Sequence, residues 1–255
     1  MTTLLSAQNI SKSYPIGKNN DLQVLKDVSL SIEHGEFVSI MGPSGGGKST
    51  LLYNISGMDR ASSGTVTFNG REISRMSEKE LAKVRLTKMG FIFQQSNLLN
   101  NLSVLDNILV AAYLDARENK TSINNRALGL MEQTGISHLK NNDITQASGG
   151  ELQRAAICRA LINQPDILFG DEPTGALNSS STNEVMDILD TINKRGSSIL
   201  LVTHDARVAA RSERVLFMLD GQIKGEYMLG KFQSEKDDWK QRETALAAWL
   251  ADMGF

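Results

Sequence analysis

The first part of the chain alternates apolar and polar positions in the manner of half-buried β-strands. The segments 22–25 and 28–32 place most of their Leu, Val and Ile residues in this pattern, and residues 37–41 then form a nearly continuous apolar run. We therefore expect an antiparallel β lobe that leads into a buried strand.

Beyond residue 60 the pattern predicts an α/β domain into which helices are inserted. Residues 62–70 read as a turn, a short strand and a second turn, whereas residues 102–136 have helical spacing with few turn signals. The last third predicts a strand at 167–169, a helix at 185–192, a strand at 199–202 and a hairpin that turns at Asp220-Gly221. The expected helical subdomain covers about residues 97–163.

A glycine-rich segment lies between the buried strand and a helical stretch. Its sequence GPSGGGKST fits G-x-x-x-x-G-K-[ST] in the strand, loop and helix context that this motif requires. Backbone N–H groups of such a loop bind phosphate oxygens, Lys48 adds a cation, and Ser49 offers a hydroxyl to Mg²⁺. A glycine-rich turn without a ligand is the alternative, but the flanking elements favour a nucleoside triphosphate. The predicted nucleotide-binding residues here are Gly42, Pro43, Ser44, Gly45, Gly46, Gly47, Lys48, Ser49 and Thr50.

Composition narrows the class of protein. With 255 residues, 40% of them hydrophobic, the chain has enough apolar residues for one large domain. A net charge of -2 gives no overall attraction to nucleic acid, and the single cysteine, Cys158, excludes an internal disulfide. We find neither an apolar run of the roughly 18 residues that a membrane span needs nor a signal peptide. We expect a cytoplasmic chain that would need another protein to cross a membrane.

Two adjacent acids end the predicted strand in ILFGDEPTGALN, residues 167–178. At such a strand end Asp171 would hold Mg²⁺, and Glu172 would accept the proton of an attacking water. Paired acids often only cap a turn, but a phosphate loop upstream favours catalysis.

The segment ASGGELQR, residues 147–154, resembles the signature motif of ATP-binding-cassette (ABC) ATPases. These residues would form a second helix N-terminus directed at phosphate, although a plain N-cap by Ser148 is also physically compatible and would be favoured if the motif stood alone. The resemblance implies a head-to-tail homodimer in which the signature of one subunit closes over ATP held by the other. The signature residues expected to contact that nucleotide are Ser148, Gly149, Gly150 and Glu151.

The resemblance extends over about residues 4–227, with the motifs in the family's order, and it implies further roles. Tyr14 would stack on adenine, although it could be a plain strand-edge tyrosine. Gln94 would touch Mg²⁺ or water and connect the core to the helical lobe, although a lone Gln is commonly a loop residue. His204 would contact the γ-phosphate. The implied catalytic residues are Glu172, His204 and Gln94; the implied Mg²⁺ ligands are Ser49, Gln94 and Asp171; the cofactors are ATP and Mg²⁺.

Three positions depart from the family pattern. Ala147 replaces the usual Leu at the start of the signature, Asn178 replaces a common Asp, and Gly46 stands where Ser is frequent. None of them removes the general base or a cation ligand. His34 and His138 are expected at the surface.

The sequence segments GFIFQQSNLL and GDEPTGALN resemble those of ATPases of the macrolide-exporter and lipoprotein-releasing class. They are most similar to those of the ATPases that serve bacitracin- or lantibiotic-resistance permeases of Gram-positive bacteria. This resemblance implies an α/β P-loop NTPase domain at 1–227, peripheral on the inner face of the membrane and bound to a separate permease, with no direct nucleic-acid contact. A soluble ABC-type ATPase of translation or DNA repair and a nucleotide-switched module without turnover are the alternatives.

Residues 228–255 carry apolar side chains near helical spacing, with charges elsewhere on the wheel. We expect an amphipathic helix that packs on its own domain rather than on a permease or in a dimer contact. The apolar positions are Phe232, Trp239, Leu246, Leu250 and Met253; the charged ones are Lys236, Asp237, Asp238, Lys240 and Arg242.

Overall fold

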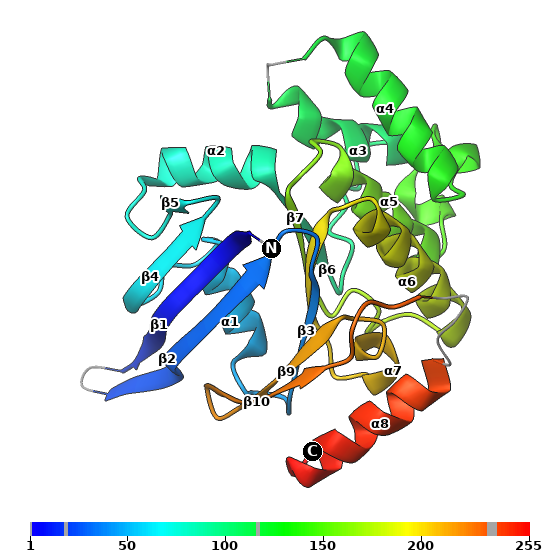
Figure 1. Cartoon of the computed structure of the whole chain (residues 1–255). Helices are drawn as coiled ribbons and strands as arrows, with labels where there is room; N and C mark the ends of the chain where they lie inside the picture. Colours follow the sequence, from blue (N-terminus) through cyan, green and yellow to red (C-terminus); the bar gives the residue numbers. More distant parts are fainter. Residues whose placement is uncertain (1, 18–19, 116–117, 234–238) are drawn as a thin grey trace. The chain divides into compact units, whose positions relative to one another are not determined.

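The computed structural model describes residues 2–17, 20–115, 118–233 and 239–255 (Figure 1). The chain divides into two compact units. The first comprises Met1–Leu81 and Asn193–Phe255, and the second comprises Ala82–Ile192. Helix α2 (Glu78–Lys88) connects them along the chain.

An antiparallel sheet forms the N-terminal part of the first unit. Its strand order is β2-β1-β4-β5, from β1 (Thr3–Ile16), β2 (Asn20–Glu33), β4 (Ser63–Phe68) and β5 (Arg71–Glu72). The long strands β1 and β2 lie side by side in the blue part of Figure 1. The predicted antiparallel lobe is confirmed.

The first unit also holds the strands that carry the phosphate loop. Strand β3 (Phe37–Met41) pairs in parallel with β8 (Ser198–Val202) and β9 (Arg214–Leu219), and β10 (Gln222–Met228) is antiparallel to β9. Every residue of β3 and β8 is buried, as parallel strands require. The hairpin predicted at Asp220-Gly221 is the β9–β10 turn. The helices here are α1 (Lys48–Ile55), α7 (Ala206–Ala209) and α8 (Trp239–Asp252).

The second unit is mainly helical and confirms the inserted helices. Strands β6 (Met89–Phe93) and β7 (Ile167–Asp171) pair in parallel. Its core joins buried side chains of α3, α4 and α5, among them Ile108, Met131 and Cys158. The helical segments are α3 (Val104–Tyr113), α4 (Lys120–Gln133), α5 (Gly149–Leu161), α6 (Ser179–Lys194) and the 3₁₀ turns η1 (Ser137–Leu139) and η2 (Ile144–Gln146).

The helix predicted at 185–192 was too short. Helix α6 begins at Ser179, where the Asn178 side chain accepts a hydrogen bond of 2.9 Å from the backbone N–H of Ser181. Asn is a strong N-cap, and it offsets the poor helix propensity of the Ser and Thr residues that follow.

The C-terminal helix α8 packs on the first unit. Leu246 and Leu250 are buried against Phe217, and the Trp249 ring meets Phe217 edge-on. Phe232 precedes the helix, and Arg211 and Arg242 each lie 5.5 Å from its ring. Trp239, by contrast, is exposed. The charges expected at Lys236, Asp237 and Asp238 lie outside the described residues.

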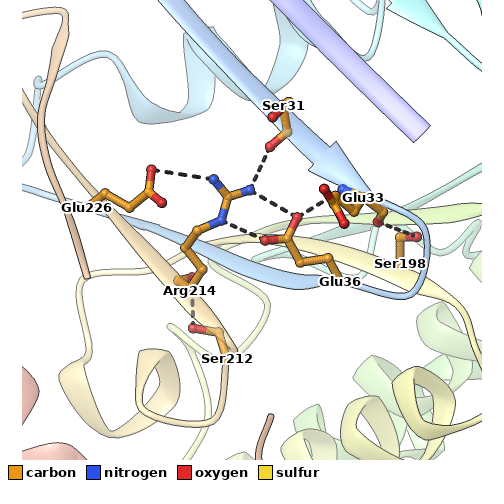
Figure 2. Close-up of polar contacts among 7 residues, drawn as sticks. All are labelled: Ser31, Glu33, Glu36, Ser198, Ser212, Arg214 and Glu226. Carbon is orange, nitrogen blue, oxygen red and sulfur yellow. Dashed lines mark hydrogen bonds and ion pairs between the residues drawn. The ribbon is translucent and has the colours of Figure 1, made fainter. Parts of the chain in front are cut away.

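A buried ion pair links the two sheets of the first unit (Figure 2). Arg214 of β9 donates to both carboxylate oxygens of Glu36, at 2.6 and 2.9 Å, and to the carbonyl of Ser31 on β2, at 2.6 Å. Glu36 also accepts from the backbone N–H of Glu33. Glu226 of β10 is a weaker, more exposed partner at 3.4 Å.

Replacing Arg214 by Met should lower the free energy of unfolding by about 3–5 kcal/mol, because it leaves the Glu36 carboxylate buried without its cation. Equilibrium urea unfolding measures this loss. Glu226→Gln is the control, and it should cost less than about 1 kcal/mol because that side chain is half exposed and its charge is screened. Equal losses in the two variants would contradict the assignment of Arg214–Glu36 as the stabilising pair.

Candidate functional site

The phosphate loop starts where β3 ends, and close packing requires glycine at its first position. Gly42 has φ +148°, and a Cβ there would lie 1.9 Å from the carbonyl oxygen of Met218. Gly47, with φ +93°, is the N-cap of α1, and within the described chain no side chain caps this helix. The N-terminus of a helix is a general binding place for anions, because its first N–H groups have no partner within the helix.

Lys48 lies folded against this loop. Its Nζ donates to the carbonyls of Gly42 and Pro43, each at 2.8 Å, and the residue is only 6% exposed. An ammonium held inside a loop of backbone N–H groups gives the loop a positive interior. This is the environment that a polyphosphate needs.

The β9–β10 turn supports the loop from the outside. The Gly46 carbonyl accepts from the Gly221 N–H at 3.2 Å, and the Gly221 carbonyl accepts from the Lys26 N–H of β2 at 2.9 Å. A Cβ on Gly46 would lie 3.1 Å from the Pro43 oxygen. Glycine at position 46 therefore fits this loop better than a residue with a side chain.

Tyr14 and His204 belong to the same unit as the loop. Val202 at the end of β8 pairs with Ile40 of β3, so the exposed His204 and the loop follow the same edge of the strands. Burial and the neighbouring Asp59 raise the pKa of the Tyr14 phenol, and a hydrogen bond with Thr50, at the loop's end, partly opposes this rise. The first unit thus brings together Tyr14, the loop and His204.

The second unit brings together Gln94, Asp171 and Glu172. Phe93 of β6 pairs with Asp171 of β7, so Gln94 and Glu172 are the next residues at one strand edge. Glu172 has φ +48°, uncommon for a residue with a side chain, and its carbonyl accepts from the Gly175 N–H at 3.0 Å. A Cβ on Gly175 would lie 3.0 Å from Nε2 of Gln94. Strained backbone of this kind is concentrated at functional sites.

The signature segment begins α5 with a capping box. The Ser148 hydroxyl and N–H donate to Glu151 Oε2 at 2.7 and 2.8 Å, and Ser148 Oγ accepts from the Glu151 N–H at 3.4 Å. The hydrogen bonds from the Ser148 hydroxyl and backbone hold the pKa of Glu151 below its usual range. The N-cap interpretation of Ser148 is therefore confirmed, and it leaves Gly149 open, with the nearest heavy atom 3.9 Å from a Cβ built there.

His34 and His138 are exposed, as predicted, and His138 Nε2 lies 3.0 Å from Glu151 Oε1. Gln153 is a site neighbour that the sequence motifs did not indicate. It is buried on α5, and its Nε2 donates to the carbonyl of Phe93, next to Gln94, at 2.8 Å. Its partner lies 60 positions away in the sequence, so no local pattern could reveal it.

Over residues 2–17, 20–115, 118–233 and 239–255 there is no group of three His, Cys, Asp or Glu residues placed to bind a metal ion by themselves. Burial raises the pKa of the Cys158 thiol to about 12, so it is not a nucleophile at neutral pH. None of the helices in these ranges combines the length and the apolar character that crossing a bilayer requires.

The region that matches known proteins contains the phosphate loop, the signature segment and Glu172. The ABC transporter family matches residues 25–175. The bacitracin export ATP-binding protein BceA of Halalkalibacterium halodurans is 42% identical over 86% of this chain and 87% of its own length. The lipoprotein-releasing system ATP-binding protein LolD of Aquifex aeolicus is 42% identical over 89% of this chain and 98% of its own length. The chain spans about a third of the length of the macrolide export ATP-binding/permease proteins MacB that it also matches.

A solved structure shares the fold. The ATP-binding cassette MJ0796, described as a dimeric post-hydrolysis state bound to ADP and Pi, has a TM-score of 0.83 and 37% identity, over 90% of this chain and 100% of that one. The predicted α/β P-loop fold, the predicted ATPase activity and the predicted family are confirmed. The chain belongs to the ABC transporter family.

Proposed function

We propose that this chain is the ATP-hydrolysing subunit of a membrane transporter that provides resistance to antimicrobial peptides or exports them. The observation that carries the proposal is the phosphate loop, with its glycine geometry and the Lys48 ammonium folded inside it. The BceA relative, a bacitracin export ATP-binding protein, supports the peptide class because the match covers most of both chains.

ATP is the proposed substrate. Residues 42–50 bind its phosphates through backbone N–H groups, and Lys48 adds its charge to the outer ones. Tyr14 stacks on adenine, and His204 contacts the γ-phosphate. Both roles are carried over from the family.

Mg²⁺ is the proposed metal, and the residues present fit it. Ser49, Asp171 and Gln94 offer hydroxyl, carboxylate and amide oxygens, the hard donors that Mg²⁺ prefers alongside phosphate oxygens. Mg²⁺ that is bound through so few protein oxygens keeps waters and substrate phosphate oxygens as its other ligands. When bound, Mg²⁺ neutralises phosphate charge.

Glu172 is the proposed general base. It accepts a proton from the attacking water while the water oxygen bonds to the γ-phosphorus, and the bond from that phosphorus to the β,γ-bridging oxygen breaks. The products are ADP and phosphate. The turn from Glu172 to Gly175 lies against Gln94 and holds the Glu172 backbone, from which the side chain extends, in place.

We propose that two copies act as a head-to-tail homodimer on a separate permease, peripheral to the inner face of the cell membrane. Ser148, Gly149, Gly150 and Glu151 would contact ATP bound by the partner subunit. The dimeric state of the MJ0796 cassette supports a dimer.

Lipoprotein release is the second candidate, because LolD matches over nearly its whole length. The two candidates are separated by expressing the chain with and without a permease of the peptide-resistance class, fractionating the cells and measuring bacitracin-type peptide resistance. We expect membrane recovery and resistance only when both proteins are present. Recovery in the membrane fraction without any permease, or an effect on lipoprotein sorting with no resistance, would contradict the proposal.

A further inference from the structure

The Tyr14 ring is held by two charged residues that belong to none of the sequence motifs. The Tyr14 hydroxyl donates to Asp59 Oδ2 at 2.7 Å, and Lys12 Nζ donates to Asp59 Oδ1 at 2.8 Å. Lys12 Nζ also donates to the Arg60 carbonyl at 2.6 Å and lies 4.7 Å from the centre of the Tyr14 ring. We call Lys12, Tyr14 and Asp59 the tyrosine clamp.

The charges of the clamp are well defined at neutral pH. Desolvation raises the pKa of Asp59, but hydrogen bonds from Lys12 and Tyr14 together with the Lys12 charge outweigh it, so the pKa lies below its ordinary value. Asp59 is then a carboxylate that accepts from both partners. The Lys12 side chain is only 11% exposed, which keeps its ion pair from being fully screened.

The clamp is tied to the phosphate loop through helix α1. Thr50, in the first turn of α1, forms a hydrogen bond with the Tyr14 phenol. Beyond the other end of the helix, the Asp59 N–H donates to the carbonyl of Tyr53 at 3.0 Å. The position of the ring is therefore fixed from both ends of the helix whose N-terminus forms the loop.

The clamp also bears on which face of the Tyr14 ring a ligand would contact. An ammonium over one face of Tyr14 stabilises the ring by a cation–π interaction, so a flat partner would stack on the opposite face. Tyr14 is 39% exposed, and Leu22, its cross-strand neighbour on β2, is 52% exposed. Together they present a partly apolar surface that a nucleobase would cover.

We propose that Lys12 and Asp59 are positioning residues that hold the Tyr14 ring at a set place relative to the phosphate loop. As a result, a triphosphate that carries a flat base binds more tightly than the bare triphosphate. This inference rests on the proposed role of Tyr14 as the platform for adenine.

The test compares the dissociation constants of MgATP and magnesium tripolyphosphate, measured by titration calorimetry on the full chain. Asp59→Ala should weaken MgATP binding by about 3- to 10-fold, the effect of losing one or two hydrogen bonds, and leave tripolyphosphate binding unchanged. Tyr14→Phe keeps the ring but loses the hydroxyl, so it should act in the same direction. The double variant Asp59→Ala/Tyr14→Phe should bind MgATP no more weakly than the single variant with the larger loss, because both changes remove the same hydrogen bond.

Arg75→Ala is the matched control, since it removes an exposed ion pair with Glu72 in the same unit. It should alter neither constant. Equal loss of both ligands in Asp59→Ala, or additive losses in the double variant, would overturn the proposal. If Asp59→Ala does not fold, Lys12→Met replaces it, and an unchanged preference for MgATP over tripolyphosphate in that variant would overturn the proposal equally. Wild-type protein that binds neither ligand would refute the proposed function instead.

Discussion

Glu172→Gln is expected to slow ATP hydrolysis by about 10²-fold or more and to leave MgATP affinity within about two-fold of wild type. The amide has the shape of the carboxylate but does not accept the proton of the attacking water, so only the chemical step is lost. Gln occupies the left-handed backbone at φ +48° at much the same cost as Glu. Single-turnover phosphate release and equilibrium nucleotide binding measure the two quantities.

Glu132→Gln is the matched control for this variant, because it makes the same change at an exposed position of α4 in the same unit. It should hydrolyse ATP at the wild-type rate. A Glu172→Gln protein that turns over at nearly that rate would remove Glu172 from the general-base role. Accumulation of an ATP-bound dimer in Glu172→Gln would agree with the proposed head-to-tail assembly.

The parts of the fold that the sequence predicted depend on local geometry. The phosphate loop and the Asp220-Gly221 hairpin each need glycine at particular backbone angles, so they are visible in a short window. The N-cap by Ser148 accepts from the Glu151 N–H, three positions along the chain, so it also gives a local signal.

What the sequence did not predict depends on long-range contacts or on weak patterns. Helix α2 has few apolar residues and many charges, so its periodicity carried no signal. The tyrosine clamp joins Tyr14 to Asp59 across 45 positions. Such pairs become visible only once the sheet and α1 bring the two segments together.

Nucleotide binding and subunit closure should be separable by two substitutions. Lys48→Ala removes the ammonium from the phosphate loop and should weaken MgATP binding to the monomer by about 10- to 100-fold, the effect of losing a charged hydrogen bond. Gly149→Asp should leave that affinity within about two-fold. A Cβ at position 149 meets no heavy atom closer than 3.9 Å, so the monomer accepts the new side chain.

The Gly149→Asp variant should nevertheless lose ATP-driven dimerisation and about 10²-fold of the hydrolysis rate, because its carboxylate would face the partner's γ-phosphate, and like charges in an interface cost several kcal/mol. Size-exclusion chromatography with MgATP in the Glu172→Gln background measures dimerisation directly. Gly129→Asp is the control, since a Cβ there meets no heavy atom within 4 Å and the residue lies on α4, outside the signature. Dimerisation of Gly149→Asp like that of Gly129→Asp would remove the signature from the dimer interface. An equal loss of monomer affinity in Lys48→Ala and Gly149→Asp would mean that both residues serve the same subunit's nucleotide.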